Sequence, residues 1–214
     1  DDLSPGGLLS KIFADYEPRD AQVEMLEAVT QALNERLYAV IEAGTGVGKS
    51  LAYLLPAVRW TIENQERVII STATINLQQQ LLENDIPLVE KIIGKPVHAT
   101  LVKGRGNYLC LRRLEDAADE MSLFGRESSE LEAIRKWSET TEDGSKSDLS
   151  FYPSPEIWSM VCSEADACMG LRCPYREKCF VVKARRAAAS SNLLVVNHHL
   201  LFSDMSARLE GAGF

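Results

Sequence analysis

Ala43-Gly44-Thr45-Gly46-Val47-Gly48-Lys49-Ser50 is the stretch that decides the fold. The apolar residues 37–41 before it are rich in β-formers and predict a strand, whereas the apolar residues 51–55 after it recur with helical spacing. A strand, a glycine-rich turn and a helix form the context of a Walker A phosphate-binding loop. The pattern therefore predicts a nucleotide-binding site on an α/β fold.

Each residue type in this loop has a chemical reason. Gly44, Gly46 and Gly48 let backbone N–H groups surround a phosphate at the positive end of a helix, and Thr45 completes the turn between them. Lys49 is expected to reach the β and γ phosphates and Ser50 to bind Mg²⁺. We therefore expect ATP and Mg²⁺ as ligands. A glycine-rich turn that binds nothing is the alternative, but the Gly-Lys-Ser ending and both flanks argue against it.

Composition limits the class of protein. The chain has 214 residues with 45% hydrophobic content, enough for one large domain or one domain with an insertion. No apolar run could span a membrane and nothing suggests a secretory signal, so we expect a cytoplasmic protein. In that compartment its five cysteines are metal ligands or free thiols rather than disulfides.

Charge is uneven along the chain. The net charge of −8 argues against a generally sticky nucleic-acid binder. Two windows near the cysteines are nevertheless basic, residues 103–113 and 171–186. Such windows are either solvated faces or local nucleic-acid contacts. Their basic residues are Lys103, Arg105, Arg112, Arg113, Arg172, Arg176, Lys178, Lys183, Arg185 and Arg186.

The order of predicted elements indicates a helix-covered parallel sheet. A short amphipathic piece at residues 8–13 and a helix from Pro18 to about Glu35 precede the loop. Arg19 and Gln22 lie three apart, so they either meet an adenine edge or mark an exposed helix start. Helices at 49–64, with Pro56 inside, and 77–93, interrupted at Pro87, then alternate with strands at 67–72 and 97–102.

This alternation stops within residues 104–189. The residues predict helices at 108–121 and 129–140, a polar loop at 142–155 and a cysteine cluster, but no strand. A strand at 192–197 and a helix at 198–208 follow. We therefore expect an α/β domain (1–103 and 190–214) with a mostly helical insertion (104–189).

The cysteine spacing suggests a metal centre in the insertion. Cys168, Cys173 and Cys179 lie close in sequence, and Cys110 and Cys162 lie upstream. Zinc sites ordinarily show pairs two to four residues apart, whereas this wider spacing suits an iron–sulfur cluster. Zinc and ordinary buried thiols remain alternatives. Cys110 or Cys162 supplies a fourth ligand; Cys110 is favoured because it would close the longer loop.

Taken together, these motifs resemble the bacterial DinG/YoaA group of iron–sulfur superfamily 2 DNA helicases, relatives of XPD, and the cysteine region looks closest to the YoaA branch. The resemblance rests on a Tyr16/Arg19/Gln22 segment before the Walker A loop and on four later stretches: residues 71–74 with 78–80, residues 103–110, the three close cysteines, and residues 195–199. It implies an ATP-driven 5′–3′ helicase of DNA repair or replication. That helicase would carry a [4Fe–4S] domain inserted in its first RecA-like domain and act on single-stranded or forked DNA.

The resemblance also implies residue roles. Arg19 and Gln22 match the adenine-reading Q motif, and Lys49 and Ser50 the nucleotide-binding pair. Thr72 and Thr74 fall in a motif that contacts the DNA backbone. Further matches are the cluster ligands Cys110, Cys168, Cys173 and Cys179, with Cys162 left as an extra thiol. Lys103 and Arg105 would border the strand, and Tyr108 would either stack on a base or pack in the core.

One departure from this family stands out. No apolar run ends in an Asp-Glu pair, and Asp119-Glu120 lies in a polar helical stretch. With the sequence ending at Gly211-Ala212-Gly213-Phe214, we expect a fragment that stops before Walker B, binds nucleotide weakly and does not hydrolyse ATP appreciably. Two other interpretations are a P-loop kinase or other NTPase with a zinc-stabilised insert, and a redox-responsive iron–sulfur module that binds DNA.

Overall fold

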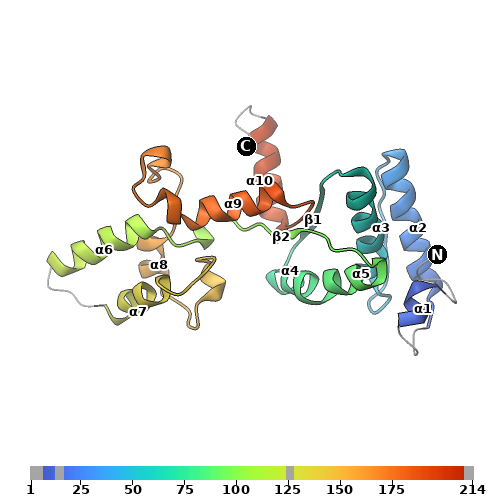
Figure 1. The fold of residues 1–214 in the computed structure, drawn as a ribbon, viewed down its shortest axis with the longest axis horizontal. Coiled ribbons are helices and arrows are strands. Elements are labelled where there is room, and N and C mark those ends of the chain that lie inside the picture. Colours follow the sequence, from blue (N-terminus) through green and yellow to red (C-terminus); the bar gives the residue numbers. More distant parts are fainter. Residues whose placement is uncertain (1–6, 13–16, 124–127, 210–214) are drawn as a thin grey trace. The chain divides into compact units, whose positions relative to one another are not determined.

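The chain folds into two compact units (Figure 1). A computed structural model describes residues 7–12, 17–123 and 128–209; Phe13, Tyr16 and residues 211–214, which entered the sequence predictions, lie outside these ranges. Unit 1 comprises Asp1–Leu101 and Ser190–Phe214, and unit 2 comprises Val102–Ala189. Each unit has its own hydrophobic core.

Unit 1 contains a parallel sheet of three strands within the described residues. These are β1 (Val68–Thr72), β2 (Ala99–Leu101) and β3 (Leu193–Asn197), in the order β1-β3-β2. Ile70 and Leu101 both pair with Val195, so β3 is the central strand. The apolar run of β3 is buried from Leu193 to Val196, as expected for a strand with neighbours on both sides.

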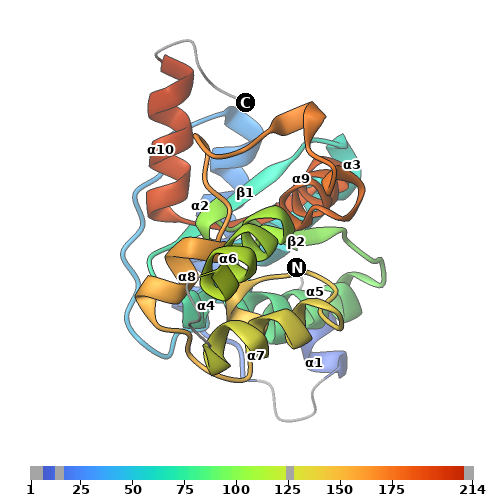
Figure 2. The same cartoon turned by 90° about the vertical axis from the view of Figure 1, so that its left-hand side faces the viewer.

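Helices cover this sheet and supply most of the unit 1 core. Leu54, Leu55 and Val58 of α3 pack with Leu193 and Val195 of β3. In Figures 1 and 2, α2 and α3 lie side by side. The helical elements are α1 (Leu8–Ile12), α2 (Asp20–Glu35), α3 (Lys49–Asn64), α4 (Ile75–Gln80), the π-helical turn η1 (Leu81–Asp85), α5 (Ile86–Ile93) and α10 (His198–Leu209). Pro87 is the second residue of α5, and the π-helical turn just before this helix is the interruption expected there.

The strand predicted for residues 37–41 is wrong for this structure. Residues 37–44 carry no regular secondary structure, although they lead into the phosphate loop. Tyr38 is 106% exposed and Val40 is 102% exposed. An isolated extended segment leaves its backbone groups to water, and a strand forms only against a hydrogen-bonding neighbour. Residues 37–41 therefore have β-forming side chains, but no strand in the described part of the chain pairs with them.

Unit 2 is helical. Its helices are α6 (Leu111–Leu123), α7 (Ser129–Ser138), α8 (Pro155–Val161) and α9 (Phe180–Ser190), joined by the single turns η2 (Arg105–Asn107), η3 (Lys146–Asp148), η4 (Gly170–Arg172) and η5 (Arg176–Lys178). Their core contains Leu109, Ile134, Trp158, Val161 and Phe180.

Two of these helices were not predicted, and a third begins later than predicted. The Ser154 side chain accepts a hydrogen bond from Ile157 N, and Pro155 follows it, which is a helix start that the sequence does display. α6 begins at Leu111 rather than Tyr108, because Tyr108 and Leu109 instead form isolated bridges with Ser145 and Cys162. Among the described residues, no helix has the length and apolar character to cross a membrane.

Candidate nucleotide and metal sites

The phosphate loop has the backbone conformation that its glycines predict. Gly46 has a φ of 80° and Gly48 a φ of 88°, both in the left-handed region that glycine tolerates best. Gly48 is also the residue from which α3 begins. The loop therefore ends at the N-terminus of α3, where the backbone N–H groups and the helix dipole favour an anion.

Lys49 and Ser50 lie on the first turn of α3. Lys49 Nζ donates to Ala43 O at 2.9 Å and to Gly44 O at 2.7 Å, so the ammonium group already sits over the loop. The Ser50 side chain hydrogen-bonds the phenol of Tyr53, whose pKa burial raises above its ordinary value. In this conformation Lys49 would exchange carbonyl oxygens for phosphate oxygens on binding a nucleotide.

Arg19 and Gln22 contact the same loop from the start of α2. Arg19 Nη1 donates to Gly46 O, and Gln22 Nε2 donates to Gly48 O at 3.0 Å. Gln22 is only 3% exposed, which excludes an exposed helix start for this residue. The two side chains and the loop thus form one site, although they are far apart in sequence.

Thr72 and Thr74 stand at the carboxyl end of β1. Thr72 Oγ1 donates to Thr74 O at 3.0 Å, and Thr74 Oγ1 accepts from Leu77 N at 3.3 Å, so both hydroxyls shape the turn into α4. Sequence analysis missed a neighbouring pair, in which Ser71 Oγ lies 2.7 Å from His198 Nδ1. The signal was available, since parallel strands end at one edge of a sheet and both residues end or follow a strand.

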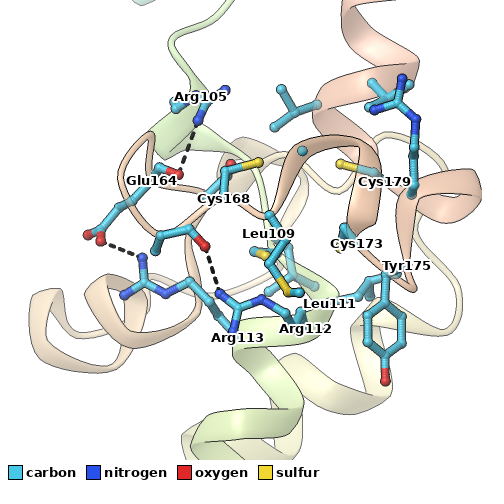
Figure 3. A pocket seen from close by; sticks show the side chains of 18 of the residues that line it. Arg105, Leu109, Leu111, Arg112, Arg113, Glu164, Cys168, Cys173, Tyr175 and Cys179 are labelled. Carbon is cyan, nitrogen blue, oxygen red and sulfur yellow. Dashed lines mark hydrogen bonds and ion pairs between the residues drawn. The ribbon is translucent and has the colours of Figure 1, made fainter.

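Unit 2 brings four of the five cysteines to one pocket. Cys110, Cys168, Cys173 and Cys179 line a cavity of about 190 Å³ with apolar walls that include Leu109 and Val181. Figure 3 shows Cys168 and Cys179 pointing toward one another across it. No three His, Cys, Asp or Glu side chains within the described ranges converge closely enough to hold a single metal ion. Four thiols around a cavity are a donor set that fits a cluster of several irons.

Cys162 lies elsewhere. It is 7% exposed, belongs to the unit 2 core and donates from Sγ to Ser159 O at 3.8 Å. Burial raises the pKa of its thiol above the ordinary value. Since Cys162 is not among the residues that line the cavity, Cys110 is the fourth thiol there.

The basic residues around Cys110 make bonds inside unit 2. Lys103 Nζ donates to Ser145 Oγ at 2.6 Å and to Ser147 Oγ at 2.7 Å, and burial lowers its pKa. Arg105 Nη1 donates to Glu164 O at 3.0 Å. Tyr108 is a core residue at 5% exposure, so its ring offers no open face to a base. Core packing is the alternative that this geometry supports for Tyr108.

These features define a class of protein, an α/β nucleotide-binding domain with a cysteine-bearing insertion. Residues 20–123 match the DEAD/DEAH box helicase family. This stretch of the chain is therefore similar to part of a DEAD/DEAH box helicase domain.

Individual relatives narrow the class. The chain is 42% identical to the ATP-dependent DNA helicase YoaA of Escherichia coli over an alignment of 219 residues. This alignment covers 100% of this chain and 33% of the relative. It is 38% identical to the ATP-dependent helicase DinG of Mycobacterium tuberculosis over 88% of this chain and 31% of the relative. It is 32% identical to the 3′-5′ exonuclease DinG of Bacillus subtilis over 92% of this chain and 21% of the relative. The chain is thus a homologue of the YoaA and DinG helicases that spans at most about a third of their length.

Proposed function

We propose that the chain is the nucleotide-binding and cluster-bearing part of an ATP-dependent 5′–3′ DNA helicase. The observation that carries this proposal is the contact of Arg19 and Gln22 with Gly46 and Gly48. Because hydrogen bonds hold Arg19 and Gln22 at the loop, both side chains can contact a nucleotide bound there. ATP bound with Mg²⁺ would engage Lys49 through its phosphates and Ser50 through the metal.

A [4Fe–4S] cluster held by the four pocket thiols is the second part of the proposal. Four thiols lining one cavity, together with their wide spacing in the sequence, support a cluster over a single zinc ion. When bound, the cluster would tie the start of the insertion, at Cys110, to its end, at Cys179. The four thiols would serve as its ligands.

Single-stranded DNA is the proposed polymer ligand, and the basic residues of 171–186 are its proposed contacts on unit 2. Arg172, Lys178, Lys183 and Arg186 are exposed, whereas Glu177 is the only acidic residue between 171 and 186. Lys103 and Arg105 face internal partners, so we assign them to the framework of the unit. On unit 1, Thr72 and Thr74 would meet the DNA backbone at the edge of the sheet.

Nucleotide binding tests the first part. A fluorescent ATP analogue with Mg²⁺ is expected to bind the wild-type chain and to bind Lys49→Ala and Gln22→Ala about tenfold more weakly, because each removes a charged or hydrogen-bonding contact at the loop. We expect no appreciable DNA-stimulated hydrolysis by these 214 residues alone. Equal affinity of Lys49→Ala and wild type would contradict the site.

DNA binding tests the second ligand. Fluorescence anisotropy with a labelled oligonucleotide is expected to show weaker binding and a shallower salt dependence for Arg172→Gln combined with Arg186→Gln, because each lost phosphate contact lowers the salt slope by about one. Lys136→Gln on α7 is the matched control, since Lys136 is an exposed lysine of unit 2 outside that window. An unchanged salt slope in the double variant would place the strand elsewhere.

Iron and acid-labile sulfide analysis of anaerobically purified protein tests the cluster. Cys110→Ser is expected to lose the iron, whereas Cys162→Ser is expected to keep it, because Cys110 lines the cavity and Cys162 does not. Iron retained by Cys110→Ser and lost by Cys162→Ser would reverse the assignment.

A further inference from the structure

Arg112 and Arg113, two and three residues after Cys110, hold the segment leading to Cys168. Arg113 reaches the C-terminal end of α8 with three separate donors. Its Nε donates to Met160 O at 3.0 Å, its Nη1 to Cys162 O at 3.0 Å and its Nη2 to Ser159 O at 2.7 Å. Carbonyls at a helix C-terminus lack intrahelical partners and carry partial negative charge, so a guanidinium there is strongly bound.

Arg112 extends the same contact toward the thiol. Its Nη2 donates to Ala167 O at 2.8 Å, and Ala167 immediately precedes Cys168 (Figure 3). Residues 163–168 include no helix and no strand, so their position depends on contacts of this kind. Holding an irregular segment in one conformation otherwise costs conformational entropy for each of its residues.

Both arginine side chains are partly buried and have carboxylate partners. The side chain of Arg113 is 17% exposed, and its Nη1 lies 2.6 Å from Glu164 Oε2. Arg112 pairs with Asp116 one turn along α6. The ion pairs and the bonds to backbone carbonyls occupy several donors of each guanidinium group, so the two arginines belong to the framework of unit 2.

We propose that Arg112 and Arg113 are positioning residues for the cysteine pocket, holding residues 159–168 so that Cys168 lies opposite Cys179 before any metal binds. The ligand role of Cys168 rests on the proposed function, but the positioning itself does not. The two basic windows then have different roles. The arginines of residues 103–113 organise the cysteine pocket, whereas those of residues 171–186 are the proposed DNA contacts.

Hydrogen exchange of the metal-free, reduced chain tests the positioning directly. Arg113→Gln is expected to speed exchange at the Ser163 and Cys168 amides by about tenfold, since hydrogen bonds from a charged donor are the stronger kind. Both amides are hydrogen-bonded in the structure, Ser163 N to Tyr108 O and Cys168 N to Ala165 O. The control is Arg135→Gln on α7, an exposed arginine outside the pocket.

Reconstitution with iron and sulfide is the second readout. Arg112→Gln is expected to bind less than about half the iron of Arg135→Gln while the fluorescence of Trp137 and Trp158 stays native, because the variant loses the bond to Ala167 O and an ion pair to the exposed Asp116 but no core contact. If Arg113→Gln unfolds unit 2, Arg112→Gln alone decides. Exchange and iron uptake equal to the control in Arg112→Gln would overturn the proposal. A pocket that takes up no iron even in wild type would instead refute the cluster and leave exchange as the test of positioning.

Discussion

Gly48 is the residue at which the phosphate loop tolerates least change. A Cβ added to Gly48 would overlap Gln22 Nε2, whereas a Cβ added to Gly46 would meet nothing within 4 Å. Both positions have a positive φ, so alanine at either is strained by about 1–2 kcal/mol. Gly48→Ala is therefore expected to lose more stability than Gly46→Ala in urea unfolding. The double variant Gln22→Ala, Gly48→Ala should recover the difference, and equal losses in the two single variants would show that Gln22 does not pack there.

Lys103 gives unit 2 a pH dependence of definite sign. Burial lowers the pKa of its ammonium group below 10.5, so between that lowered pKa and 10.5 the unfolded chain binds more protons than the folded chain. The unfolding free energy of wild type should therefore rise with pH in this window relative to that of Lys103→Met. At neutral pH the variant is expected to be less stable by about 1 kcal/mol, from the lost hydrogen bonds to Ser145 and Ser147. Parallel stability curves for the two proteins would contradict the assignment.

At the scale of elements, the sequence predicts a strand at residues 37–41, whereas the structure has an exposed segment without regular secondary structure. A substitution distinguishes these two alternatives. Val40→Lys is expected to change the unfolding free energy by less than about 0.5 kcal/mol, because the side chain is fully exposed. Leu54→Ala in the core of α3 should cost about 2–5 kcal/mol. Urea unfolding compares them. A loss in Val40→Lys that approaches that of Leu54→Ala would mean that the segment is buried in solution, as its sequence predicts.

How far the elements follow from sequence depends on whether their causes are local. The alternation of helices and strands in unit 1 is readable because periodicity and turn residues act within one segment, as in α3 and β1. The outcome at residues 37–41 is not readable, since pairing depends on a neighbour far away in sequence. α8 was not predicted, although Ser154-Pro155 is a local helix-start signal in the sequence.

For the sites, the glycine loop and the cysteines were readable from residue type and spacing alone. Spacing left open whether Cys110 or Cys162 joins the other three thiols, because only the packing of Cys162 into the core separates them. The roles of Arg112 and Arg113 were also hidden. A basic run reads the same whether its donors meet phosphates or carbonyl oxygens.

At the scale of the molecule, the two cores share no residue, so the units should respond separately to ligand removal. Removing the proposed cluster with an oxidant and a chelator is expected to speed amide exchange in residues 102–189 and to leave α3 and β3 unchanged, because metal binding contributes to the folding free energy of its own unit. Adding nucleotide with Mg²⁺ should instead protect the start of α3. Faster exchange in both units after metal removal would mean that they unfold as one.

The central place of β3 has a consequence for biosynthesis. β1 and β2 leave the ribosome first, yet among the described strands each pairs only with β3, whose residues follow the whole of unit 2 in the sequence. Chains fold from the N-terminus as they are made, but this sheet has no middle until Leu193–Asn197 emerges. Unit 2 is thus fully translated while the sheet of unit 1 still lacks its central strand. The cysteines of unit 2 can therefore react in the nascent chain before that sheet is complete.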